Sequence, residues 1–243
     1  PFVSQKDYED IVFAAEQDYD FIAASFTRTA EDIMEIRKIL QEHGGEKIHI
    51  IAKLENKQGV KNCEDILRVA DGIMIARGDM GVEIPLEDVP VIQKDIISKV
   101  YSAGKQVITA TQMLDSMIKN PRPTRAETTD VANAIYDGTS AIMLSGESAA
   151  GKYPVLTVST MAKIAEHTEK DIRYDKRFLM YEFKIRNTLD AISHATCGMA
   201  IDIGAKAIVV CTLSGITARM VSRFRSPVDI VGITTNKKTW RKL

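Results

Sequence analysis

The sequence has little of several features that would mark a specialised class of protein. Its 243 residues include only three cysteines, Cys63, Cys197 and Cys211, which are widely spaced and odd in number. This pattern argues against a disulfide framework and predicts a cytoplasmic protein, because thiols stay reduced in the cytosol. Cys211 lies in an apolar run and is expected to be a small core residue. No apolar run approaches the roughly 18 residues of a membrane span, so no membrane partner is expected.

The sequence also has almost no excess of positive or negative charge. Lys and Arg total 32 and Asp and Glu total 33, which gives a net charge of −1. This balance excludes a bulk electrostatic attraction to nucleic acid or anionic lipid. The four histidines have no metal-ligand spacing. The N-terminus has no basic segment followed by an apolar stretch, so no signal peptide is predicted, and the absence of an initial Met predicts a fragment or a processed start.

What the sequence contains is one unit repeated five times: an apolar run, then polar residues, then a helical pattern. Buried strands are predicted at 21–26, 48–54, 72–76, 107–110 and 141–144. Helices are predicted at 7–17, 30–42, 62–69, 89–103, from 125 through 135, and from 154 to about 167. The expected helix N-termini are marked by Ser4, Thr29 and a capping box from Thr124 to Glu127.

Polar residues that follow the strands predict the fold class. They recur at intervals of 26 to 34 residues, as Ser25, Lys53, Asp79, Thr111 and Ser145. Apolar strands that alternate with helices predict a parallel sheet covered on both faces. Polar side chains at every strand end are typical of a (β/α)₈ barrel, whereas the alternative, an open doubly wound sheet, gathers function at one switch point. The sequence therefore predicts an α/β protein with a partial TIM (β/α)₈ barrel, namely its last five βα units.

The composition changes near Lys170, which predicts a second domain. Residues 1–170 are expected to form the partial barrel, and residues 171–243 to form part of an α/β C-terminal domain. The segment 171–184 is dense in charge and aromatic residues, as at a domain junction. One βαβ unit follows, with helices at 188–203 and 218–225 and strands at 207–211 and 230–234.

Two strand ends combine charges of opposite sign. Lys53 and Glu55 project to the same side of an extended strand, and Asp79 follows the next strand in a turn that contains Gly78 and Gly81. Two carboxylates and an ammonium group at neighbouring strand ends suit a divalent cation and an anionic oxygen substrate. The alternative is one ordinary ion pair at a strand end.

Several segments resemble those of pyruvate kinases. Residues 50–60, Ile-Ile-Ala-Lys-Leu-Glu-Asn-Lys-Gln-Gly-Val, resemble the active-site lysine signature of that family. Residues 71–81, Asp-Gly-Ile-Met-Ile-Ala-Arg-Gly-Asp-Met-Gly, resemble its metal-site segment. Residues 110–114, 120–127 and 143–148 match further family segments in order and at matching spacing. The resemblance implies a glycolytic enzyme that transfers a phosphoryl group from phosphoenolpyruvate to ADP, giving pyruvate and ATP.

The resemblance also implies roles for the metal and the substrate. Glu55 and Asp79 would hold Mg²⁺ or Mn²⁺, and Lys53 would neutralise the phosphoryl group as it moves. Backbone N–H groups from Ala76 to Gly78 would bind the substrate carboxylate, with Asp79 at the end of the same segment. The substrate-binding residues are therefore expected to be Lys53, Ala76, Arg77, Gly78, Asp79 and Thr111.

Two hydroxyl groups complete the implied catalytic set. Thr111 would lie near the methylene carbon and assist protonation of the enolate, and Ser145 would take part in the proton relay, with an ordered water as the donor. The residues alone leave other interpretations open. Thr111 could cap the segment after its strand, and Ser145 could serve the turn that it forms with Gly146.

In pyruvate kinases the turn that matches residues 212–217 can bind a sugar-phosphate effector. The candidate ligands here are Thr212, Ser214, Gly215 and Thr217, at a helix start. The turn also contains Ile216 and has no nearby lysine. A plain helix N-cap is the equal alternative.

The resemblance implies further partners outside this chain. K⁺ is expected for the family, but its ligands and most nucleotide contacts would lie in preceding strands, and the family is usually a homotetramer. One rival interpretation is a Mg²⁺-dependent lyase or aldolase on a similar barrel, and another is an inactive structural fragment. The isolated chain is expected to be inactive and to associate through the open edges of the strands at 21–26 and 141–144.

Overall fold

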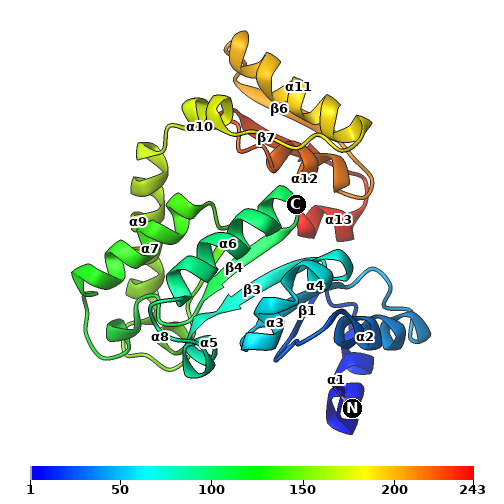
Figure 1. The fold of residues 1–243 in the computed structure, drawn as a ribbon, viewed down its shortest axis with the longest axis vertical. Helices are drawn as coiled ribbons and strands as arrows, with labels where there is room; N and C mark the ends of the chain where they lie inside the picture. The colour runs from blue at the N-terminus through cyan, green and yellow to red at the C-terminus, as the bar shows by residue number, and fades with distance from the viewer. Residues whose placement is uncertain (1) are drawn as a thin grey trace. The chain divides into compact units, whose positions relative to one another are not determined.

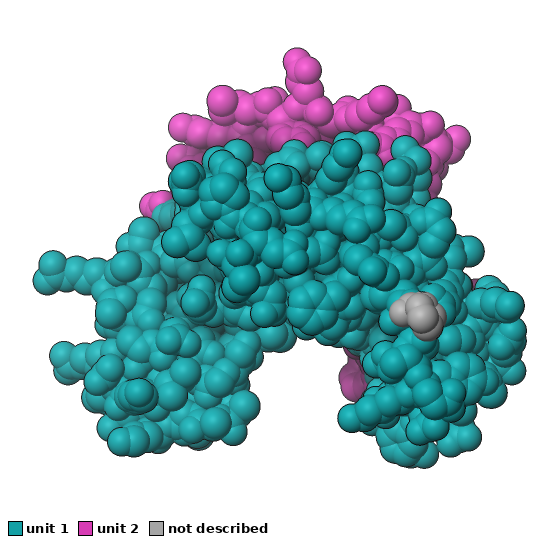
Figure 2. Space-filling view, turned by 60° about the horizontal axis from the view of Figure 1, so that its bottom comes forward, with its two compact units in different colours: residues 1–101, 106–170 teal, residues 102–105, 171–243 magenta. Residues whose placement is uncertain are grey.

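The computed structural model describes residues 2–243, which form two compact units (Figures 1 and 2). Unit 1 comprises residues 1–101 and 106–170, and unit 2 comprises residues 102–105 and 171–243; Pro1 is not described. The main division falls after Lys170, where the composition changes. Within the described part of the chain, no helix combines the length and the apolar character needed to cross a membrane.

Unit 1 is built on a parallel sheet whose spatial order equals the chain order (Figure 1). Its strands are β1 (Phe21–Ala24), β2 (His49–Leu54), β3 (Gly72–Ala76), β4 (Gln106–Ala110) and β5 (Ala141–Met143). All neighbouring pairs are parallel, and the register pairs Leu54 with Ile75 and Ala76 with Ala110. Sequential neighbours in a parallel sheet, each followed by a helix, are the arrangement of a (β/α)₈ barrel, so the predicted fold class is confirmed.

One helix precedes the first strand of unit 1, and helices follow every strand. They are α1 (Gln5–Glu16), α2 (Ala30–Glu42), α3 (Lys57–Lys61), α4 (Cys63–Val69), α5 (Arg77–Glu83), α6 (Val89–Ser102), η1 (Asp115–Ile118), α7 (Arg125–Asp137), α8 (Gly146–Ala149) and α9 (Pro154–Asp171). The predicted caps at Ser4 and Thr124 are confirmed, because each side chain accepts a hydrogen bond from the N–H three residues later. Gly104 follows α6 with φ +69°, a conformation that glycine adopts without strain.

The two faces of the sheet have different environments, because side chains alternate along each strand. One face carries completely buried residues such as Leu54, Ile75 and Val107. Helices α2, α4 and α6 also bury isoleucines completely, and α2 packs on β2. The other face carries a smaller cluster, in which Ile51, Met74 and Ala110 are buried and Ile108 and Met143 are partly buried. Lys53 shares the strand face of Ile51 and therefore lies on this second face.

Two sequence expectations about unit 1 are wrong. The strand at 21–26 is not buried, since β1 ends at Ala24 and both Phe21 and Ala23 are exposed. The reason is that β1 is an edge strand with one described neighbour, β2. The turn expected around Asp79 is instead helix α5; although Gly78 and Gly81 lower its helix propensity, the helix is anchored by Met80, which is completely buried.

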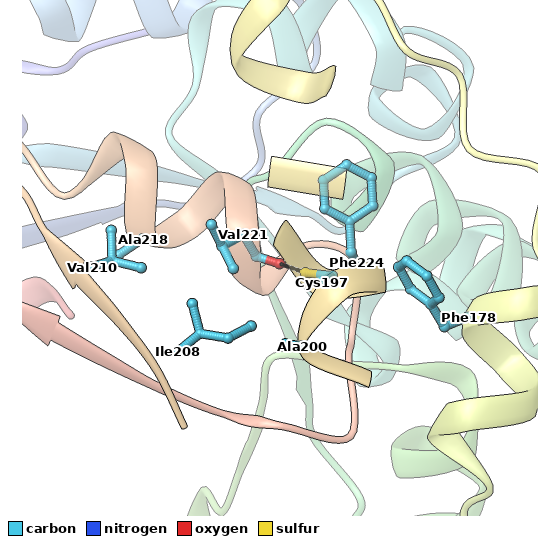
Figure 3. Packing of buried hydrophobic residues seen from close by; sticks show 8 residues of the cluster. All are labelled: Phe178, Cys197, Ala200, Ile208, Val210, Ala218, Val221 and Phe224. Atoms are coloured by element: carbon cyan, nitrogen blue, oxygen red, sulfur yellow. Dashed lines mark hydrogen bonds between the residues drawn. The ribbon is translucent and has the colours of Figure 1, made fainter. Parts of the chain in front are cut away.

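Unit 2 contains a two-stranded parallel sheet and a separate core. Its elements are α10 (Tyr174–Met180), α11 (Thr188–Asp202), β6 (Ala207–Cys211), α12 (Ile216–Ser222), β7 (Asp229–Ile233) and α13 (Lys237–Lys242). Figure 3 shows Cys197 among the apolar residues of this core, with its Sγ 3.6 Å from the carbonyl oxygen of Val221. The sequence pattern does not predict α10 or α13. Cys211 was expected in the core, but it is exposed, because burial alternates along β6 and Cys211 faces away from α12 and the core.

Candidate active site

The charged and polar residues of interest lie where β2, β3, β4 and β5 end. Since the strands are parallel, their C-terminal ends meet at one edge of the sheet, and the register sets Glu55 level with the start of α5. Lys53 and Glu55 continue the strand face of Ile51, so they belong to the side of the sheet that carries the smaller cluster.

Lys53 and Glu55 form a direct ion pair. Lys53 Nζ lies 2.7 Å from Glu55 Oε1, and it also donates to Ser25 Oγ at 2.9 Å. The Glu55 side chain is 1% exposed and that of Lys53 is 23% exposed. The second oxygen of Glu55 accepts the N–H of Phe26. Strand β2 therefore presents a buried carboxylate and a half-buried ammonium group that tie its end to the residues after β1.

Asp79 occupies the first turn of α5, and its side chain is exposed. The Asp79 side chain forms no hydrogen bond or ion pair with another described residue. Both Glu55 oxygens have a partner, but each carboxylate oxygen retains a further lone pair for a cation. Among residues 2–243, no group of three or more His, Cys, Asp or Glu side chains could hold a metal ion. Two carboxylates with open positions suit Mg²⁺, which usually takes one or two protein carboxylates and fills the other positions with substrate oxygens and water.

Thr111 follows β4 in an unusual backbone conformation. Its φ is +70°, and that of Gln112 is +52°. The Thr111 hydroxyl accepts the N–H of Gly78 at 2.7 Å and donates to the Ala110 carbonyl at 2.6 Å. The N–H group of Gly78, expected to bind a substrate carboxylate, is thus bonded to Thr111 in this structure. A Cβ added at Gly78 would lie 3.4 Å from Thr111 Oγ1, an ordinary contact, so the packing of the chain itself does not require glycine there.

Ser145 follows β5, and its Oγ is buried without a hydrogen-bond partner among the described residues. Glu147, 1% exposed, accepts the N–H of Ser145 at 2.8 Å and that of Leu114 at 3.1 Å. This carboxylate joins the segments after β4 and β5. Sequence reasoning missed this linking role of Glu147; its position directly after Ser145-Gly146 was the available signal.

The side chain of Arg77 was also missed, because only its backbone N–H had an expected role. Its guanidinium bonds to the carbonyl oxygen of Thr111 and forms an ion pair with Asp130 of α7, with Nη1 2.7 Å from Asp130 Oδ2. Arg77 and Asp130 are 53 positions apart, and no feature of the sequence alone indicates that they meet. The one available signal was that the turn of residues 111–114, which Arg77 contacts, follows β4 directly.

The turn before α12 uses its hydroxyl groups internally. Thr212 Oγ1 accepts the N–H of Gly215 at 3.0 Å, and Ser214 Oγ accepts that of Ile216 at 3.4 Å. Gly215 has φ +80°, and a Cβ there would lie 3.3 Å from both Leu243 and Thr239. These hydrogen bonds lie within the turn before α12, whose N-cap, Gly215, has no side-chain cap hydrogen bond. Binding of an effector at Thr212 to Thr217 stays a prediction.

An edge of parallel strands that combines a lysine, two carboxylates and hydroxyl groups is the arrangement typical of (β/α)₈-barrel enzymes, and these residue types suit a divalent cation and an anionic substrate. Two family models match the chain: "Pyruvate kinase, barrel domain" over residues 1–158 and "Pyruvate kinase, alpha/beta domain" over residues 190–243. The chain belongs to the pyruvate kinase family. This assignment disfavours the lyase or aldolase alternative.

Curated relatives agree with the family models. The chain is 54% identical to a pyruvate kinase of Clostridium acetobutylicum over 246 residues, which cover 100% of this chain and 52% of the relative. It is 51% identical to a pyruvate kinase of Clostridium perfringens over 248 residues, with 52% of that relative covered. For a pyruvate kinase of Geobacillus stearothermophilus the identity is 51% over 244 residues, with 42% covered. The chain therefore spans about half the length of the curated relatives that it matches, or less.

Proposed function

We propose that this chain forms the cation- and enolate-binding part of an enzyme that transfers a phosphoryl group from phosphoenolpyruvate to ADP, yielding pyruvate and ATP. The proposal rests above all on the Lys53–Glu55 ion pair beside the first turn of α5, where the Asp79 side chain has no partner among the described residues. Family membership supports the same reaction.

Glu55 and Asp79 are the residues that would hold Mg²⁺ or Mn²⁺ together with oxygens of the substrate and water. A bound divalent cation would neutralise charge on the phosphate and enolate oxygens. Lys53 contributes a positive charge from the strand side, and its half-buried position strengthens that charge relative to an exposed lysine. Its contact with Ser25 Oγ holds the ammonium group in place before substrate binds.

The backbone of Ala76, Arg77 and Gly78 supplies N–H groups at the start of α5 for the substrate carboxylate. In this role the Gly78 N–H exchanges Thr111 Oγ1 for a carboxylate oxygen. The Thr111 hydroxyl then becomes available near the methylene carbon that gains the proton. Ser145 has a buried hydroxyl oxygen with no hydrogen-bond partner in the described part of the chain, which suits an ordered water in the proton path.

Further parts of this function are expectations for the family. K⁺ and most nucleotide contacts would involve residues outside this chain, and the active form would be a homotetramer in the cytoplasm, acting in glycolysis. A sugar phosphate at Thr212, Ser214, Gly215 and Thr217 is the corresponding regulatory proposal for unit 2.

The test is formation of pyruvate from phosphoenolpyruvate and ADP by the full-length enzyme, coupled to NADH oxidation. Glu55→Gln should lower kcat by at least about 10²-fold, the scale of losing one preorganised electrostatic group. The matched control is Glu64→Gln, which removes an exposed carboxylate of α4 paired with Lys99 at 3.5 Å and should leave turnover unchanged. Wild-type enzyme that forms no pyruvate, or equal losses in both variants, contradicts the proposal.

A further inference from the structure

The segment after β4 holds an unfavourable backbone conformation at the residue proposed to assist protonation. A φ of +70° is rare for a β-branched residue, because its Cβ crowds the backbone, and Gln112 follows with φ +52°. Two consecutive non-glycine residues in this region persist only where surrounding contacts enforce them. Contacts from other residues must therefore hold Thr111 in this backbone conformation.

Arg77 holds this conformation through hydrogen bonds from one edge of its guanidinium group. Nη2 donates to the Thr111 carbonyl at 2.7 Å and to the Gln112 carbonyl at 3.3 Å, and Nε reaches the Thr111 carbonyl at 3.3 Å. Nη2 also lies 2.8 Å from Met113 Sδ. The planar guanidinium fork thus contacts three successive residues of the turn in one fixed geometry.

The other edge of the guanidinium group, at Nη1, is held by residues of two helices. Nη1 donates to Asp130 Oδ1 of α7 at 2.8 Å and to Gln93 Oε1 of α6 at 3.4 Å. Gln93 is 3% exposed, and its Nε2 donates to Asp137 Oδ2 at 3.1 Å. The Arg77 side chain is itself only 10% exposed. Arg77 therefore has little freedom to move away from the turn.

We infer that the Arg77 side chain, held by Asp130 and Gln93, is a positioning residue that keeps Thr111 in the left-handed conformation and so aims its hydroxyl at the substrate. The inference rests on the proposed function and adds a role that the backbone N–H of Arg77 does not cover. The hydroxyl bond to the neighbouring Gly78 N–H is the observed result of this arrangement. Loss of the guanidinium group lets the turn relax and moves the hydroxyl away.

A double-mutant cycle in the full-length enzyme separates positioning from general structural support. Arg77→Met should lower kcat by about 10²-fold, the effect expected of a small displacement of a reacting group. In a Thr111→Ala background the same change should lower kcat by less than about threefold, because the group that it positions is absent. An equal loss in both backgrounds, or no loss in wild type, overturns the inference.

The matched control is Arg37→Met. Arg37 also binds a carbonyl and a carboxylate, at 3.1 Å from Val69 O and 2.8 Å from Asp71 Oδ2, but at the N-terminal ends of the strands. Its loss should reduce stability and leave the kcat of the folded enzyme within about twofold of wild type, as for distant independent sites. If Arg77→Met fails to fold, Asp130→Asn keeps the arginine but removes its ion pair, and should lower kcat about tenfold in the same Thr111-dependent way.

A crystal structure of whichever of these two variants folds tests the inference independently of activity. Thr111 should have a negative φ, and its Oγ1 should no longer accept the Gly78 N–H. A variant that keeps φ near +70° and this hydrogen bond overturns the inference even if turnover falls. If the wild-type enzyme forms no pyruvate, the proposed function fails, while the geometry of the turn still decides whether Arg77 holds Thr111.

Discussion

Lys53 Nζ and Glu55 Oε1 lie 2.7 Å apart, and the two partners differ sharply in exposure, at 23% for the lysine side chain and 1% for the glutamate. A surface ion pair would have both partners in solvent and contribute little. Here the carboxylate is buried, whereas the ammonium group retains access to the edge of the sheet. That asymmetry suits a lysine that serves a ligand as well as its neighbour.

Lys53→Met should abolish phosphoryl transfer and spare enolization of pyruvate. A neutral side chain cannot offset phosphoryl charge, so we expect turnover to fall by at least about 10³-fold. Coupled assays measure the transfer, and deuterium incorporation into the methyl group of pyruvate measures enolization. A loss below tenfold in transfer would mean that Lys53 is only a structural partner of Glu55.

Stability provides the control for that variant. Removal of Lys53 leaves the Glu55 carboxylate buried without its cation, which should reduce the free energy of unfolding by up to about 3 kcal/mol. Adding Glu55→Gln should recover part of that loss, because the amide carries no charge. Denaturant unfolding of both variants then distinguishes a misfolded enzyme from one that lacks the lysine charge.

Gly78→Ala should separate folding from substrate binding. A Cβ at this position meets Thr111 Oγ1 at 3.4 Å, an ordinary contact, and alanine in helix α5 gains up to about 1 kcal/mol of helix propensity over glycine. We therefore expect a fold at least as stable as wild type. If the backbone here binds the substrate carboxylate, the KM for phosphoenolpyruvate should nevertheless rise by about tenfold or more. An unchanged KM contradicts the assigned carboxylate site.

The sequence predicted the parallel sheet, its order of strands and the residues at its C-terminal edge, because hydrophobic periodicity and cap signals are local. The exposure of β1 could not be predicted, since Phe21–Ala24 has the composition of an interior strand and its edge position depends on its neighbours. The same limit applies to Cys211, whose exposure depends on which face of a two-stranded sheet is covered.

The site residues also divide into those that local sequence patterns predict and those that depend on tertiary packing. Lys53 and Glu55 were predictable, because i and i+2 on a strand share a face. Arg77 and Asp130 were not predictable as a pair, since their 2.7 Å contact depends on how the tertiary fold brings α7 to the start of α5. The positive φ of Thr111 gave no sequence signal either, because threonine is not a residue that favours that conformation.

Glu127 should make stability depend on pH. It accepts hydrogen bonds from the N–H and hydroxyl of Ser116, at 2.7 and 2.6 Å, and from those of Thr124, at 2.7 and 2.9 Å. Burial alone would raise the pKa of the Glu127 carboxyl, but these hydrogen bonds hold the pKa below its usual value. A lowered folded-state pKa means that this stabilisation is complete above the unfolded pKa, about 4.3, and is lost as the pH falls through the folded value.

Glu127→Gln should therefore reduce the free energy of unfolding at pH 7 by about 1–2 kcal/mol, the scale of a helix cap with charge-assisted bonds. The difference from wild type should shrink as the pH falls below about 4. Urea unfolding at several pH values measures it. A difference that is constant across this range would contradict an ionised capping role.

The last prediction concerns the metal ligands. Glu55 and Asp79 should supply the only side-chain ligands for Mn²⁺, because Glu147, the carboxylate that follows β5, already accepts the N–H groups of Leu114 and Ser145. In the full-length enzyme with phosphoenolpyruvate, Glu55→Gln and Asp79→Asn should each weaken Mn²⁺ binding by at least about tenfold, as measured by electron paramagnetic resonance.

Glu147→Gln is the matched control for the metal prediction. The amide keeps only one acceptor oxygen for two N–H donors, so the variant should lose about 1–3 kcal/mol of stability. Because that carboxylate lies outside the proposed metal site, Mn²⁺ affinity should stay within about threefold of wild type, as expected for an independent position. A crystal structure with Glu147 bound directly to Mn²⁺, or a tenfold loss of affinity in a folded Glu147→Gln variant, would show that the cation lies nearer β5 than β3 and that the assignment of Asp79 is wrong.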